Sequence, residues 1–184
     1  MQDEKLLIKK CLKHDEKALS ELYNNFSGKM YGICLRYAKN KMDADDLLHD
    51  GFLKVLKNLQ AYRGEGSFEG WMRRIMVNTA INFYRKKSSH YDSDIEDAYD
   101  LSDSSFDNAL SQISTNELLE LIQDLPDGYR LVFNMFVIEG YKHREIAEIL
   151  NISENTSKSQ LLKAKITLKK NLEIKYKITE NVNR

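Results

Sequence analysis

The sequence predicts an all-α protein of two small helical domains joined by a flexible acidic linker. Apolar residues recur at the helical period of 3.6 through most of the chain, without the alternation typical of strands. The only proline is Pro126. Residues 88–110 are rich in Ser and Asp and have no hydrophobic period, so this segment cannot bury enough surface to order itself.

The first domain is predicted over residues 1–87. Its helices are expected at about 3–12, 15–27, 28–39, 43–61 and 67–87. Asp43 is expected to cap the fourth helix, with Asp46 completing a capping box, and Ser67 is expected to cap the fifth. The apolar arc of the fourth helix should be buried and comprises Leu47, Leu48, Phe52, Val55, Leu56 and Leu59.

The second domain is predicted over residues 111–176, followed by a tail at 177–184. Its helices are expected at about 110–125, 127–139, 143–150 and 154–174. Pro126 suits the first position of the second of these, where a missing N–H costs nothing.

Bulk composition limits where the protein works. The 184 residues are 42% hydrophobic and 30% charged, as in soluble proteins, and no apolar run approaches the ~20 residues of a membrane span. The first residues lack a signal-peptide pattern, so we expect a cytoplasmic protein without direct membrane insertion. Cys11 and Cys34 stand among apolar residues without a CxxC partner, so we expect buried, reduced thiols and neither a metal nor a cofactor.

A net charge of zero hides a strong asymmetry along the chain. Residues 1–87 hold 17 Lys and Arg against 11 Asp and Glu, and residues 88–129 hold 11 acids and no base. Residues 130–184 hold 11 bases against 6 acids. Two basic blocks are thus separated by an acidic one, and each basic block carries enough positive charge for a nucleic-acid partner.

Residues 143–164 have the plan of a helix-turn-helix: a short helix, a tight turn and a basic helix that Ser153 can cap. Leu161, Ala164, Leu168 and Leu172 should pack inward. Lys158, Ser159, Leu162 and Lys163 fall outside that arc, in the half of the helix that enters a major groove. A solvated basic face is the alternative interpretation.

Two faces of the first domain stand out. Residues 71–87 hold five bases, no acid, several aromatics and two amides, a pattern that suits single-stranded DNA. Phe68 and Trp71 could equally belong to the core. On the fourth helix, Asp46, His49, Asp50 and Leu53 share an outward face that suits a basic protein partner, although an ordinary solvated face is equally compatible with the pattern.

These motifs resemble a known family. Residues 43–55 (DADDLLHDGFLKV) and 62–78 (YRGEGSFEGWMRRIMVN) resemble region two of the extracytoplasmic-function sigma factors. Residues 125–133, 139–147 and 156–161 resemble region four. The similarity runs from about residue 15 to 174 and is interrupted only by the linker.

The resemblance implies a non-enzymatic factor that binds core RNA polymerase and promoter DNA, with an anti-sigma factor as a further partner. It implies that Asp46, His49, Asp50 and Leu53 meet the clamp helices of the largest polymerase subunit, and that the polymerase flap is a second contact. The residues implied for the minus-ten element are Arg63, Ser67, Phe68, Trp71, Arg74, Asn78, Asn82, Arg85 and Lys86. Those implied for the minus-thirty-five element are Thr156, Lys158, Ser159, Leu162 and Lys163.

The chain departs from the family pattern at both faces. His49 and Asp50 stand where Gln or Glu is common. Lys158, Gln160 and Lys163 stand where arginines are common, and lysine supplies a point charge rather than the planar fork that reads guanine.

Two other interpretations start from the same residues. The adjacent His49 and Asp50 resemble the metal-binding pair of HD-type phosphohydrolases, but that site needs further ligands, and His14, His90 and His143 are scattered along the chain. The second is a two-domain helix-turn-helix regulator that does not bind core polymerase. Residues 71–87 disfavour it, because a ligand-sensing domain needs no DNA face.

Overall fold

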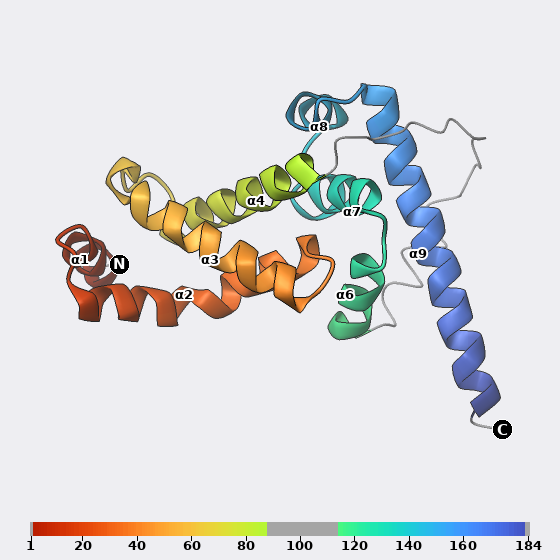
Figure 1. Ribbon diagram of the computed structural model, residues 1–184, viewed down its shortest axis with the longest axis horizontal. Coiled ribbons are helices and arrows are strands. Elements are labelled where there is room, and N and C mark those ends of the chain that lie inside the picture. The colour runs from red at the N-terminus through yellow and green to blue at the C-terminus, as the bar shows by residue number, and fades with distance from the viewer. Residues whose placement is uncertain (1, 88–113, 183–184) are drawn as a thin grey trace. The chain divides into compact units, whose positions relative to one another are not determined.

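The computed structural model describes residues 2–87 and 114–182, and every regular element there is a helix, which confirms the predicted all-α class (Figure 1). The chain divides into two compact units, residues 1–83 and 84–184. The predicted linker at 88–110 lies outside the described residues.

The described residues of the first unit form four α-helices and one 3-10 turn, and the last helix runs four residues past the boundary at residue 83. They are α1 (Gln2–Cys11), α2 (Glu16–Tyr37), α3 (Lys41–Lys57), the 3-10 turn η1 (Leu59–Ala61) and α4 (Phe68–Lys87). Helix α2 is continuous, so the prediction of two helices at 15–27 and 28–39 was wrong. Gly28 is exposed with open space around it, and one such glycine weakens a helix by about 1 kcal/mol without ending it.

Helix α3 begins earlier than expected. Its cap is Asn40, whose side-chain oxygen accepts a hydrogen bond of 2.8 Å from the Asp43 N–H, so the predicted capping box of Asp43 and Asp46 was wrong. The N–H of Asp43 needs a partner in the first turn, and Asn40 provides it three residues upstream. Asp43 instead places its carboxylate in that turn, where negative charge is favourable.

The buried side of α3 follows the predicted arc, with one exception. Leu47, Leu48, Phe52, Val55 and Leu59 are all at most 8% exposed. Leu56 is 38% exposed, contrary to prediction, because at about 100° per residue it lies at the edge of the buried arc, one step past Val55.

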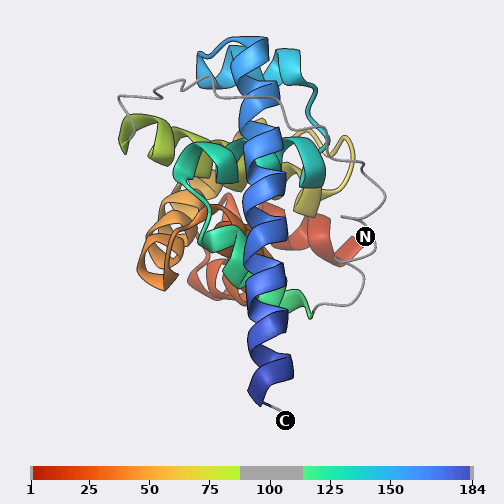
Figure 2. The same ribbon diagram turned by 90° about the vertical axis from the view of Figure 1, so that its right-hand side faces the viewer.

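In the second unit, residues 114–182 form four α-helices and a π-helical turn. They are α6 (Thr115–Gln123), α7 (Asp127–Phe133), the π turn η2 (Asn134–Ile138), α8 (His143–Leu150) and α9 (Glu154–Val182). Helix α9 contacts α6, α7 and α8, and its length is evident in Figure 2. It continues past the predicted end at residue 174, and Pro126 takes the cap position of α7 rather than its first turn.

A buried arginine braces the start of α7. Arg130 is 1% exposed and donates to the carbonyls of Gln123 and Leu125, at 3.1 and 2.6 Å, and to the Asp127 carboxylate at 2.5 Å. A buried guanidinium needs such partners to offset its lost hydration. The network fixes the turn around Pro126 and so the angle between α6 and α7.

Both cysteines are free and buried, as predicted. Burial raises the pKa of the Cys34 thiol to about 12, so this thiol stays protonated and unreactive at neutral pH. No helix of the described chain is long and apolar enough to cross a membrane.

Candidate functional site

The outward face of α3 carries a mixed acidic and apolar row. Asp46, His49 and Asp50 are exposed, and Leu53 is 54% exposed. Within the described residues, neither Asp46 nor Asp50 has an ion-pair partner. Met42 extends this row by one turn and is 71% exposed, a residue that the sequence analysis missed although its spacing of four from Asp46 places it on the same face.

The loop between η1 and α4 is held in a fixed shape. Gly64 and Gly66 have φ angles of 76° and 79°, which residues other than glycine rarely adopt. The Tyr62 hydroxyl donates to the Gly66 carbonyl at 2.9 Å, which closes the loop. Ser67 accepts a hydrogen bond of 3.0 Å from the Gly70 N–H and so caps α4, as predicted.

An aromatic cluster lies beneath this loop. Phe68 is completely buried and contacts Phe26, Tyr62 and Trp71, with the Trp71 ring stacked on it at 5.6 Å. Its implied contact with DNA is therefore corrected: Phe68 is a core residue that supports the loop. Trp71 is only half-buried, so it packs on Phe68 while part of its surface remains open to solvent.

The outer face of α4 forms a polar and basic row. Arg74, Asn78, Asn82 and Arg85 are all exposed and recur at intervals of three or four residues, which places them on one side of the helix. Arg63 is exposed on the adjoining loop, and the side chain of Lys86 lies outside the described part of the chain. The rest of the α4 surface is core and includes Met72, Met76, Val77, Ala80 and Ile81.

The second unit contains the predicted helix-turn-helix. Helix α8 ends at Leu150 and is capped by Asn151, whose φ of 56° is the left-handed conformation that lets the chain reverse. The Ser153 hydroxyl then accepts a hydrogen bond of 2.9 Å from the Thr156 N–H, so Ser153 caps α9 as predicted. The cap and the turn together set the angle at which α9 leaves α8.

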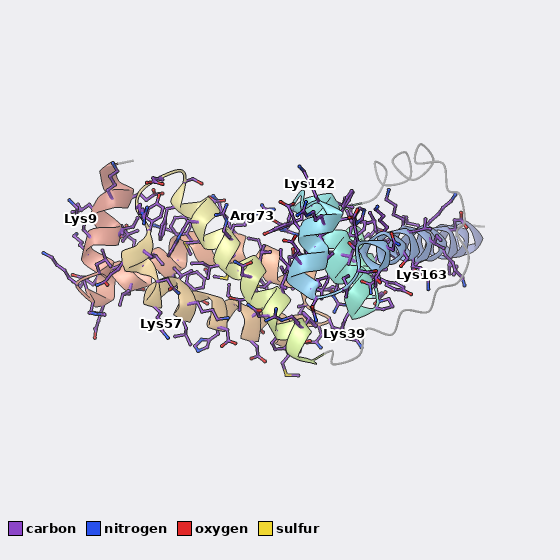
Figure 3. The ribbon with its side chains drawn as sticks, turned by 90° about the horizontal axis from the view of Figure 1, so that it is seen from above. Lys9, Lys39, Lys57, Arg73, Lys142 and Lys163 are labelled. Carbon is purple, nitrogen blue, oxygen red and sulfur yellow. The ribbon has the colours of Figure 1, made fainter. Side chains whose placement is uncertain are left out.

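The faces of α9 separate largely as predicted. Leu161, Ala164, Leu168 and Leu172 are buried. Lys158 and Ser159 are exposed, whereas Thr156, Leu162 and Lys163 are half-buried; Lys163 is labelled on α9 in Figure 3. Gln160 stands at a position where arginines are common in the family. It is only 7% exposed, so it belongs to the packed side of the helix and not to its DNA-facing side.

The HD-type hypothesis finds no ligand set in the residues that the structure describes. No group of three or more His, Cys, Asp and Glu side chains there is arranged to hold a metal ion. His49 and Asp50 instead lie on the open face of α3.

Comparison with known proteins gives these faces a common context. Residues 22–90 match the family model of sigma-70 region 2, and residues 115–168 match that of sigma-70 region 4. The ECF RNA polymerase sigma-E factor of Haemophilus influenzae is 27% identical over 170 residues, which cover 86% of this chain and 89% of the relative. The chain belongs to the extracytoplasmic-function sigma factors. The sigma-E factor of Escherichia coli K12 is likewise 27% identical, over 88% of this chain and 90% of its own.

A solved structure shows the same fold. The sigma factor RpoE of Bartonella quintana, solved with the anti-sigma factor NepR, matches with a TM-score of 0.50 and 15% identity over 86% of this chain and 98% of that one. As an extracytoplasmic-function sigma factor, the protein binds core RNA polymerase and directs promoter recognition and transcription initiation.

Proposed function

We propose that this sigma factor divides its task among three faces. The exposed row of α3, made of Met42, Asp46, His49, Asp50 and Leu53, binds the clamp helices of the largest polymerase subunit. The outer face of α4, with the braced loop before it, binds the minus-ten element. The amino-terminal half of α9 binds the minus-thirty-five element, and the second unit also meets the polymerase flap.

The main support for a polymerase-binding surface on α3 is its row of exposed acidic side chains, which form no ion pair within the described residues. Asp46 and Asp50 are exposed, lack an ion-pair partner within the described residues, and are bracketed by Met42 and Leu53, two large apolar side chains exposed to water. Exposed apolar groups beside unpaired charges suit a protein interface, where burial supplies affinity and charge supplies orientation.

The proposed minus-ten face combines the chemistry that single-stranded DNA needs. Arg74 and Arg85 offer charge to the backbone, Asn78 and Asn82 offer amides to base edges, and Trp71 offers a partly open ring for stacking. Holding a base out of the stack costs a few kcal/mol, so the base needs a preformed pocket. The rigid loop from Tyr62 to Ser67 can form one wall of such a pocket.

We place region two at residues 1–87, the linker at 88–110, region four at 111–176 and a tail at 177–184. The protein works in the cytoplasm and has no catalytic residue, since the polymerase performs the chemistry. An anti-sigma factor is a further partner. A purified candidate should form a one-to-one complex with this protein that excludes core polymerase; simultaneous binding of both would refute that role.

The deciding experiment is equilibrium binding to core RNA polymerase from the protein's own source, with the housekeeping sigma factor as competitor. We expect competitive one-to-one binding. The double variant Asp46→Lys/Asp50→Lys should weaken it about tenfold or more, because loss of two surface contacts of about 1 kcal/mol each already removes about 2 kcal/mol of binding free energy.

The matched control is Asp3→Lys/Glu21→Lys, which makes the same change of net charge at exposed acids of α1 and α2. It should bind like the unmodified protein. Equal weakening by both pairs would mean that only net charge matters. No polymerase binding by the folded protein would leave the helix-turn-helix regulator as the remaining interpretation.

A further inference from the structure

The side chain of His143 joins three elements of the helix-turn-helix. His143 is the first residue of α8, and its ring stacks on Phe136 of the π turn with centroids 4.4 Å apart and planes 22° from parallel. Its Nδ1 lies 2.9 Å from the hydroxyl of Ser157 on α9, which is completely buried. The ring is therefore a fixed contact between α8, α9 and η2.

This contact lies at the base of the proposed DNA-binding half of α9. Ser157 stands between Thr156 and Lys158, so its hydrogen bond to His143 fixes the turn that presents both neighbours. Lys158 is exposed and forms an ion pair with Glu154 at 2.9 Å. A phosphate bound by Lys158 has to compete with Glu154 for it.

The charges around His143 favour its neutral form. Burial and the nearby charge of Lys158 lower the pKa of His143 from its ordinary value of 6.5, while Glu154 opposes them. A proton there would also add positive charge to the first turn of α8, whose free N–H groups already carry partial positive charge. The charged groups on α8, on the residues just before it and on the first two turns of α9 are Glu139, Lys142, Arg144, Glu145, Glu148, Glu154 and Lys158.

Several of these charges are already engaged. Glu145 accepts a hydrogen bond from the Lys142 N–H at 2.7 Å, and Arg144 pairs with Glu148 at 3.4 Å. Glu139 also has an interaction partner. The change that DNA brings is therefore felt at His143 mainly through Lys158 and Glu154.

We propose that His143 couples binding of duplex DNA by α9 to the uptake of a proton. This inference rests on the proposed contact between the amino-terminal half of α9 and DNA. A phosphate opposite Lys158 offsets the positive charge that repels the proton, so bound DNA favours the imidazolium. Coupling between two binding sites is reciprocal, so protonated His143 strengthens DNA binding by the same factor. A charged His143 also attracts Glu154, which loosens that carboxylate's hold on Lys158.

The expected signature is an affinity that rises as the pH falls through the histidine range. The probe is a short fluorescein-labelled duplex of mixed sequence, read by anisotropy at fixed low salt between about pH 5.5 and about pH 8. The slope of log affinity against pH should be negative. Its His143 part should not exceed about one unit, because one site takes up at most one proton.

His143→Gln is the decisive variant, because an amide can still pair with Ser157 but does not titrate. It should lose a clear part of the negative slope. His14→Asn is the matched control: it removes an exposed histidine whose φ of 58° asparagine tolerates, and should keep the full slope. An unchanged slope in folded His143→Gln would overturn the proposal.

Two further measurements keep the test decisive if His143→Gln folds poorly. Glu154→Gln should move the rise in affinity to lower pH, since the negative charge of Glu154 stabilises the protonated form of His143. In NMR titration of the full chain, the pKa of the His143 ring should be higher with the duplex than without it, and equal values would overturn the coupling. Lys158→Gln separates the two proposals: if it changes neither affinity nor salt dependence at any pH, the DNA face itself is misplaced.

Discussion

Helix α3 approaches α4 at Gly51, and this contact allows a sharp test of the packing in the first unit. A Cβ atom added at Gly51 would lie 2.1 Å from the Sδ and 2.9 Å from the Cε of Met76, which is 1% exposed. Overpacking of this kind costs about 1–3 kcal/mol. Alanine returns about 1 kcal/mol of helix propensity. Because the clash is deep and the Met76 side chain is enclosed, we expect Gly51→Ala to lose about 1–2 kcal/mol net.

Thermal unfolding followed by Trp71 fluorescence suits this test, because Trp71 is the only tryptophan and lies in the first unit. For a unit of this size each kcal/mol shifts the melting temperature by about 4–8 °C, so Gly51→Ala should melt several degrees lower. Gly28→Ala is the matched control. Its added Cβ meets nothing within 4 Å, so it should raise the melting temperature.

A double-mutant cycle isolates the contact. In a Met76→Ala background the clash is gone, so Gly51→Ala should there be neutral or stabilising by about 1 kcal/mol. An equal effect of Gly51→Ala in both backgrounds would refute the reasoning, as would a rise in melting temperature in the otherwise unmodified protein.

Three further predictions concern the second unit. Ser153→Ala removes the α9 cap and should cost about 1 kcal/mol in chemical unfolding followed by circular dichroism, whereas an unchanged midpoint would mean that another group caps α9. Lys163→Ala should flatten the salt dependence of duplex binding by about one unit, and an unaltered slope would place the DNA face elsewhere. Hydrogen bonds from Ser114 lower the pKa of Glu117 from 4.5. Its contribution to stability is therefore present above about pH 4.5 and lost as the pH falls through the lowered value. Glu117→Gln should reduce this acid sensitivity in unfolding measured over that range.

The sequence predicted most of the helices because apolar residues recur along their buried faces at the helical period. Helix α8 begins and ends where the sequence places it, and the caps at Ser67 and Ser153 form as expected. The error at Asp43 arose because several polar residues precede the apolar period, and only geometry shows that Asn40 reaches the first turn. The predicted break between residues 27 and 28 does not form, because the small cost of Gly28 is outweighed by the packing of α2 on both α1 and α3.

The functional faces were predictable to the extent that they are helical surfaces. Helical spacing separated Asp46, His49 and Asp50 from the core. It left open whether Phe68 belongs to the core or to the DNA face, because the packing of Phe68 depends on rings from α2 and from the segment after η1. His143 escaped notice for the same reason: its partners are distant in sequence, and a lone histidine has no local signature.

The π turn after α7 has a consequence for anyone who exchanges parts between sigma factors. The Glu139 N–H bonds to the carbonyl of Asn134, five residues back, so the chain holds a surplus residue compared with an α-helix. Deleting that residue would let the backbone hydrogen bonds continue as in an ordinary α-helix. The chain after the π turn would then rotate by about 100° about the helix axis and move by about 1.5 Å toward α7. The aim of the helix-turn-helix is thus set by a single-residue register, and a chimera joined upstream of Asn134 must preserve it.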